Sequence, residues 1–164
     1  MPLEKEVHNL RHSPATHAVA VTGYVYQKGK FLVLKRANQP LIWAPPGGRL
    51  KLDEDPHSGV LREVHEETGL NVQVVSLVDY WFGEIGTYGK LLSLDFLTLS
   101  DSGDVLLSNE HTDFAWATLD DLEHGNPPLG EDPSSFRLSD FQKAASECRR
   151  MMYLMPSPRC AISK

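Results

Sequence analysis

Three glutamates crowd one short stretch of the sequence, and their type and spacing could do chemistry. Glu63, Glu66 and Glu67 stand at positions i, i+3 and i+4, so on a helix they would share one exposed side. Like charges at this spacing repel one another and destabilise a helix by about 0.2–0.5 kcal/mol per pair. Some counter-charge is therefore expected close to them.

The glutamate cluster has two interpretations. It can be a solvated acidic face, partly balanced by Arg62 four residues before Glu66, because runs of charge usually face water. It can instead be the site of a hard cation, since Mg²⁺ prefers oxygen ligands and shares them with water and substrate phosphates. The neighbouring His57 and His65 are not expected ligands, because oxygen suits Mg²⁺ better than imidazole.

The surrounding residues decide between these interpretations. Five residues separate Gly48 from Glu54, and seven more lead to the run REVHEETGL. This arrangement resembles the Nudix hydrolase signature GX₅EX₇REUXEEXGU, in which U is a bulky aliphatic residue. Every fixed position is filled, over the segment Gly48–Leu70, which we call the Nudix box. The filled positions are Gly48, Glu54, Arg62, Glu63, Val64, Glu66, Glu67, Gly69 and Leu70.

The resemblance implies a fold, a cofactor and a reaction class. The fold is α/β, a Nudix-like α/β/α sandwich with a mixed β-sheet and a catalytic loop–helix–loop, in a single domain over residues 1–164 with its core at about 15–155. The cofactor is Mg²⁺, with Mn²⁺ as the alternative. The reaction is hydrolysis of a phosphoanhydride bond in a nucleoside diphosphate linked to another moiety, such as a nucleotide sugar, a dinucleoside polyphosphate or a nucleoside triphosphate. A homodimer is compatible with the resemblance.

Roles for individual residues also follow from the resemblance. It implies metal ligation by Glu63, Glu66, Glu67 and the carbonyl of Gly47. It implies that Arg62 and Glu54 pair and orient the helix, while Gly48 and Gly69 are structural positions of the box. The catalytic residues expected are Glu63, Glu66, Arg62 and Glu110.

The general base and the substrate contacts stay open. The base is either a box glutamate or an acid of a later loop, where Glu110 is favoured over Asp113. Arg36 and Arg49 lie near the expected site and could hold phosphates, or could be surface charges. Tyr88 stands near a position where dinucleoside polyphosphate hydrolases often have Tyr, although a turn residue is equally expected there. The run Tyr80–Phe82 could stack on a base, but a strand that packs alternate rings inward is the more common case.

Three variable positions depart from what is frequent in the family. Asp53 stands where Gly is common before the first box glutamate, and Lys51 stands where an acid is common. Gly59 stands where Ala is frequent. None of the three touches a fixed position, but Lys51 and Asp53 could alter the loop that carries Glu54.

The elements that must position these residues can be predicted from periodicity and turn chemistry. A hairpin is expected first, then a helix with Asp55 as its N-cap and Gly69 as its stop. A strand pair with a Gly-rich link, a short strand, a short helix and an amphipathic helix follow. The expected strands are 15–26, 31–35, 72–82, 91–99 and 114–117, and the expected helices are 56–68, one from Thr118, and 135–154, with a loose tail from 156.

The whole-chain properties narrow the class of protein. The formal net charge of −6 argues against a general nucleic-acid binder, which needs a basic face. No apolar run is long enough to span a membrane, and the N-terminal stretch does not resemble a secretory signal. Cys148 and Cys160 match neither a redox pair nor a zinc site. A cytoplasmic protein without a nucleic-acid or membrane partner is therefore expected.

Two other function classes compete with the hydrolase. Some Nudix-fold domains only sense nucleotides, but these usually lose box carboxylates, and this box is complete. An isomerase of isoprenoid diphosphates shares the fold but needs an additional Cys and Glu near the site. Both cysteines here stand in the C-terminal part of the chain, which disfavours that activity.

Overall fold

A computed structural model of the chain describes residues 17–85, 89–101, 103–132 and 135–154. Tyr88 and the tail from residue 156 lie outside the described residues, so the expectations for them have no structural counterpart here. The elements are β1 (Ala18–Gln27), β2 (Lys30–Arg36), β3 (Trp43–Ala44), β4 (Gly47–Arg49), α2 (Pro56–Thr68), β5 (Gln73–Glu84), β6 (Lys90–Leu99), β7 (His111–Ala117), α3 (Leu119–Glu123) and α4 (Leu138–Leu154). In the described ranges, no helix has both the length and the apolar character needed to cross a membrane.

The sheet is mixed, and β1 lies at its centre. One edge of β1 pairs in parallel with β6 along almost its whole length, and β6 pairs antiparallel with β5. The other edge of β1 is shared, because its C-terminal end pairs with β2 and residues 20–22 pair with β4. β2 also pairs with β7 and β3. This sharing joins β4, where the Nudix box begins, directly to the central strand.

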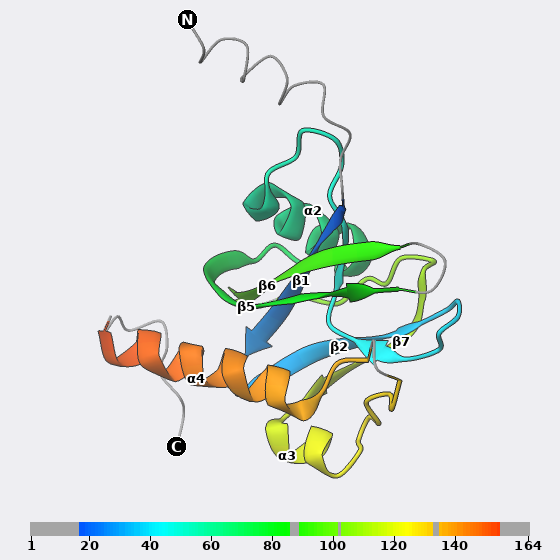
Figure 1. The fold of residues 1–164 in the computed structure, drawn as a ribbon. Helices are drawn as coiled ribbons and strands as arrows, with labels where there is room; N and C mark the ends of the chain where they lie inside the picture. The colour runs from blue at the N-terminus through cyan, green and yellow to red at the C-terminus, as the bar shows by residue number, and fades with distance from the viewer. Residues whose placement is uncertain (1–16, 86–88, 102, 133–134, 155–164) are drawn as a thin grey trace, which may run out of the picture.

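Helices cover both faces of the sheet, as Figure 1 shows, with α2 on one side and α3 and α4 on the other. Successive side chains of a strand point to opposite faces, so one strand supplies both cores. In β1, Val21 and Val25 pack toward α2, whereas Tyr24 packs toward α4. The predicted α/β/α arrangement with a mixed sheet is confirmed.

The box helix α2 begins and ends where the sequence predicts. The Asp55 side chain accepts a hydrogen bond from the Ser58 amide, Pro56 takes the first turn, and Gly69 ends the helix with a left-handed φ of 71°. Val60 and Val64 are fully buried against β1. A Cβ built on Gly23 would lie 2.8 Å from a Val64 methyl carbon, so the absence of a side chain at Gly23 lets the helix approach the sheet closely.

Some boundaries differ from the sequence-based expectation. β3 and β4 lie in a Pro/Gly-rich segment that was expected to be loop, because two or three residues carry no periodicity of their own. β7 begins three residues earlier than expected, at His111, where β2 provides a partner for its backbone. α4 begins at Leu138 instead of 135. Short elements of this kind are selected by neighbouring strands rather than by local sequence.

The structure also explains two of the three departures from the family pattern. Asp53 has a φ of 60°, a conformation that Gly adopts freely and Asp tolerates better than most residues. A Cβ on Gly59 would overlap the Leu50 side chain. Lys51 forms an exposed ion pair with Glu66 at 3.4 Å.

The close approach of α2 to β1 gives a stability prediction. Gly23→Ala should lower the free energy of unfolding by about 1–3 kcal/mol, because the added methyl group overpacks against Val64. Urea denaturation of Gly23→Ala, Val64→Ala and the double variant checks this. The two changes should cost less together than the sum of their separate costs, since the second removes the clash. Strictly additive costs would contradict the assigned contact.

Candidate active site

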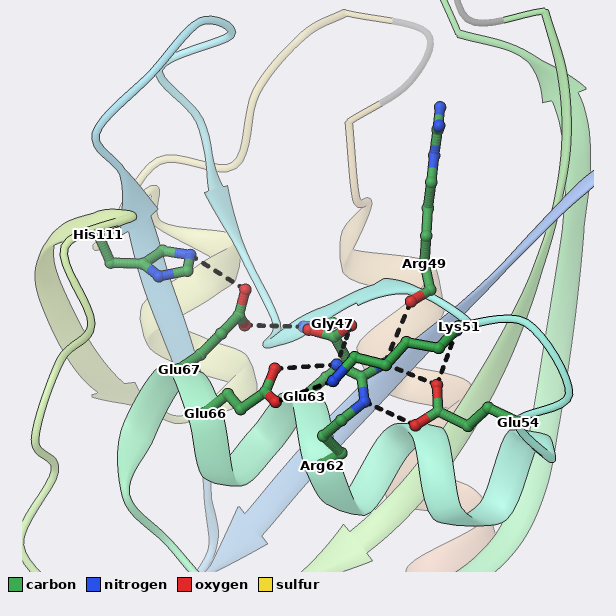
Figure 2. A network of polar contacts seen from close by, with 9 residues as sticks. All are labelled: Gly47, Arg49, Lys51, Glu54, Arg62, Glu63, Glu66, Glu67 and His111. Carbon is green, nitrogen blue, oxygen red and sulfur yellow. Dashed lines mark hydrogen bonds and ion pairs between the residues drawn. The ribbon is translucent and has the colours of Figure 1, made fainter.

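Arg62 is the centre of the polar contacts at the box (Figure 2). Its Nε and Nη2 atoms donate to the two carboxylate oxygens of Glu54 at 2.6 and 2.8 Å. Its Nη1 atom donates to Glu63 at 2.7 Å and to Glu66 at 2.9 Å. Nη2 also reaches the Arg49 carbonyl at 3.2 Å. The predicted pairing of Arg62 with Glu54 is therefore present, and it is bidentate, the strongest form of such a pair.

Glu54 ties the loop before the helix to the helix itself. Its second oxygen also accepts the Lys51 amide at 2.9 Å. The hydrogen bonds from Arg62, together with the Lys51 amide, lower the pKa of Glu54 to about 2. The same arginine, with Lys51, lowers the pKa of Glu66, whose side chain is half exposed. Both carboxylates are therefore ionised at neutral pH and hold the guanidinium in place.

The three glutamates do not share one exposed side of the helix, so that expectation was wrong: the Glu66 side chain is 51% exposed, but that of Glu63 is only 13% exposed. Glu67 is the most deeply buried of the three. It stands seven residues after Val60, which is close to two helical turns, and so lies near the buried side. Only 7% of Glu67 is exposed. One of its carboxylate oxygens accepts the Gly47 amide at 2.9 Å, and the other lies 3.8 Å from His111 Nε2.

Burial raises the pKa of Glu67 to about 8. The Gly47 amide opposes this shift, while the negative charges of Glu63 and Glu110 add to it. Burial likewise raises the pKa of Glu63, despite its contact with Arg62. A buried carboxyl group whose pKa is raised by burial and by two nearby acids is typical of active sites.

Gly48 leaves the room that Glu63 occupies. A Cβ built on Gly48 would lie 2.7 Å from the Glu63 carboxylate carbon. Any larger residue at this fixed position of the box would push the carboxylate away from β4. Gly48 therefore has a steric role, as expected for a structural position.

Glu110 reaches the same region from the loop before β7. Its backbone carbonyl accepts the Ala37 amide at 2.8 Å, which anchors the loop to the end of β2. Glu110, His111, Glu67 and Gly47 all line one cleft. Asp113 is exposed and accepts the amide of Phe114, and it is absent from the described lining of the cleft.

The cleft has a volume of about 820 Å³ and runs from Glu67 across the face of the sheet that α4 covers. Glu63 and Glu66 are not among its described lining residues. Arg36 and Arg49 also line the cleft, and their expected role in binding phosphates stays a prediction. The Arg49 side chain extends away from the carboxylates, while its carbonyl contacts Arg62 (Figure 2).

The sequence-based search missed several residues of the cleft. Asp95 and Ser93 of β6 and Thr22 of β1 line it beside Trp81 and Lys143. The available signal was the alternation in Leu92-Ser93-Leu94-Asp95-Phe96, where polar residues occupy every second position of a strand. His111 was also missed, because nothing in its local sequence distinguishes it from a surface histidine.

The donor set fits a hard divalent cation. Among the described residues, no three acid, His or Cys side chains converge closely enough to hold a metal ion as they stand. Arg62 draws Glu63 and Glu66 toward itself, and the Gly47 amide holds Glu67. The side-chain donors are all carboxylate oxygens. The negative charges of Glu63 and Glu110 disfavour the ionised form of Glu67, and a bound Mg²⁺ would offset that repulsion. His57 and His65 are exposed on the helix.

A family model, NUDIX domain, matches residues 16–138 of the chain. The chain is 38% identical over 111 residues to a "MutT-like protein" of Streptomyces ambofaciens, and the aligned region covers 67% of this chain and 70% of that protein. It is 32% identical over 108 residues to an "ADP-ribose pyrophosphatase" of Methanocaldococcus jannaschii, which covers 64% of each chain. The crystal structure of a MutT protein from Methanosarcina mazei aligns with a TM-score of 0.67 and 27% identity, over 81% of this chain and 96% of that chain.

Asp95 gives a prediction for the pH dependence of stability. Burial, with the charges of Asp140 and Asp79, raises its pKa from 3.8 to about 6, although hydrogen bonds from Ser93 and Thr22 oppose the shift. Between these two pH values the folded protein keeps a proton that the unfolded chain has released, so the free energy of unfolding falls as pH rises. From pH 4 to pH 7 this contribution falls by at most about 3 kcal/mol.

Urea denaturation of the wild type and of Asp95→Asn at both pH values isolates this contribution. The wild type should lose more stability than the variant as pH rises. An identical pH dependence in the two proteins would show that Asp95 titrates normally and is not buried as described.

Proposed function

The chain belongs to the Nudix hydrolase family and is a pyrophosphohydrolase, and on this basis we propose that it hydrolyses a nucleoside diphosphate linked to another moiety in a Mg²⁺-dependent reaction. The whole chain is proposed to act as one catalytic domain. The observation that carries the proposal is the buried Glu67, held by the Gly47 amide beside Glu63 and Glu110 where the cleft meets the box.

The metal is proposed to be held by the carboxylates of Glu63, Glu66 and Glu67 and the carbonyl of Gly47. When bound, Mg²⁺ neutralises phosphate oxygens and lowers the pKa of a water molecule. The protein's contribution is the position of its acids. Glu63 and Glu67 come from one rigid helix, and Gly47 lies in β4, which pairs with the central strand. Such a support fixes the backbone from which the proposed ligands project.

Arg62 is proposed to orient the ligands rather than to contact the substrate. Its described contacts go to Glu54, Glu63, Glu66 and the Arg49 carbonyl. It therefore limits the movement of two proposed ligands while Glu54 fixes the guanidinium from the loop side. Arg36 and Arg49 are proposed to bind the phosphates, because both line the cleft.

Glu110 is the residue we propose as general base. The base must remove a proton from the attacking water, so it must face the cleft and stay close to the metal ligands. Glu110 lines the cleft, and its charge contributes to the raised pKa values of Glu63 and Glu67. Glu66 suits this task less, because Arg62 lowers its pKa and so makes it a weaker base.

The names of the relatives do not identify the group that is linked to the nucleoside diphosphate in the substrate. ADP-ribose hydrolases often have a Pro about fifteen residues after the box, and this chain has no Pro between Leu70 and Asn126. The name of the Methanocaldococcus relative therefore does not decide the substrate. A nucleotide-sensing module without catalysis is the alternative, and the complete set of box carboxylates disfavours it.

A substrate panel with and without Mg²⁺ or Mn²⁺ tests the reaction. The panel comprises nucleoside triphosphates, nucleotide sugars, dinucleoside polyphosphates and ADP-ribose, with phosphate-bearing products measured. Glu63→Gln and Glu67→Gln should each lower kcat by at least about 100-fold on the best substrate, because each removes a proposed ligand. Circular dichroism should show an unchanged fold. Near-wild-type kcat in both variants would refute the ligand assignment, and negligible turnover of every nucleotide would favour the sensing module.

Glu110 and Asp113 provide a matched pair for the general base. Glu110→Gln should lower kcat by about 100-fold with little change in KM, because proton removal is lost while binding is kept. Asp113→Asn should stay within about twofold of the wild type, since its side chain lies outside the described cleft lining. The assignment fails if the two substitutions have equal effects on kcat.

A further inference from the structure

The cleft continues beyond Glu67 to a second polar group on the sheet, which we call the polar floor: Thr22, Ser93 and Asp95. Thr22 of β1 stands beside Asp95 of β6 in the parallel register. The Ser93 hydroxyl donates to Asp95 Oδ1 at 3.1 Å, and Thr22 and Ser93 share a hydrogen bond of 3.2 Å. Thr22 and Asp95 are only 4% and 7% exposed, yet all three residues line the cleft.

The charge of Asp95 lacks an obvious structural use. A buried carboxylate costs free energy unless it is paired with a cation or fully hydrogen-bonded. Within the described residues it accepts hydrogen bonds from the hydroxyl groups of Ser93 and Thr22, and the nearby Asp79 and Asp140 carry the same sign of charge. The ammonium group of Lys143 on α4 is engaged by Asp79. Asp95 therefore faces the cleft with hydrogen-bonding capacity that a donor on a ligand could satisfy.

An aromatic surface lies next to the polar floor. Trp81 of β5 stands directly opposite Ser93 in the antiparallel register, and it lines the cleft. A Cβ built on Gly83 would overlap the Trp81 ring, so the ring lies across the backbone of its own strand. Tyr80 and Phe82, at the alternate positions, are exposed to 65% and 51%. Of this aromatic run, Trp81 is the member held beside the polar floor.

We propose that the polar floor binds a guanine base, with Asp95 accepting hydrogen bonds from the ring N1–H and the 2-amino group while Trp81 packs on the base. The proposal rests on the proposed function, because it assumes that a nucleotide lies in the cleft with its phosphates at the box. An ionised carboxylate can only accept hydrogen bonds. Guanine presents two adjacent donors on one edge, whereas adenine and cytosine present an amino group beside an acceptor, and uracil presents one donor between two carbonyls. An aromatic ring accepts any base, so the discrimination comes from Asp95.

Calorimetric titration with nucleoside monophosphates in the presence of Mg²⁺ tests this without requiring turnover, because these ligands contain no phosphoanhydride bond. The wild type should bind GMP about tenfold more tightly than IMP, which lacks the 2-amino group, and at least as selectively over AMP and UMP. Asp95→Asn should lower the affinity for GMP about tenfold. Asp113→Asn is the matched control, since it makes the same change of carboxylate to amide outside the described cleft lining, and it should keep GMP affinity within about twofold.

Each outcome of the titration decides the proposal. Equal affinities for GMP, IMP and AMP in the wild type, or no measurable binding of GMP, would overturn it without any variant. Unchanged GMP affinity in Asp95→Asn would also overturn it. A parallel hydrolysis panel separates the two levels of inference. Mg²⁺-dependent hydrolysis without base preference would support the proposed function and overturn the guanine site. Guanine-selective binding without hydrolysis of any nucleotide would support the guanine site and overturn the proposed function.

Discussion

The bidentate ion pair between Arg62 and Glu54 is the interaction on which the rest of the site depends. It joins the loop after β4 to the box helix, and the same guanidinium also contacts Glu63 and Glu66. Without that charge, neighbouring carboxylates on one helix would repel each other and turn away. Arg62 therefore lets a strongly acidic surface exist at a fixed geometry. Lysine could supply the charge but not the planar set of donors that spans three carboxylates.

The acids of the box helix are held by two kinds of partner. Glu63 and Glu66 are held by Arg62, whereas Glu67 lies on the sheet side and depends on a backbone amide. Burial makes the charge of Glu67 costly, as its raised pKa shows. Negative charge is therefore incompletely compensated at Glu67, where the cleft meets the helix. A cation bound there would be attracted by this negative charge.

Local sequence was sufficient to predict the box helix, because Asp55, Pro56 and Gly69 define its ends chemically. The hairpin and the longer strands were likewise predictable from local sequence, whereas the pairing of Arg62 with Glu54 was expected only from the resemblance to the family. Glu67 was wrongly predicted to be exposed. Its spacing from Glu63 and Glu66 was considered, but not its position two helical turns after the buried Val60. The polar floor was missed for another reason. It requires β1 and β6 to pair in parallel, and that contact joins residues about seventy positions apart, which no local pattern encodes.

The alternation of β1 separates two tasks that the sheet performs. Val21, Gly23 and Val25 face the box helix, while Thr22 and Tyr24 face the side that α4 covers. A substitution at Thr22 can therefore reshape the cleft without moving the helix that carries the acids. Conversely, a one-residue slip of this strand would damage both faces at once. Ligand preference can consequently drift by point mutation during evolution, whereas an insertion or deletion within the central strand would be purged.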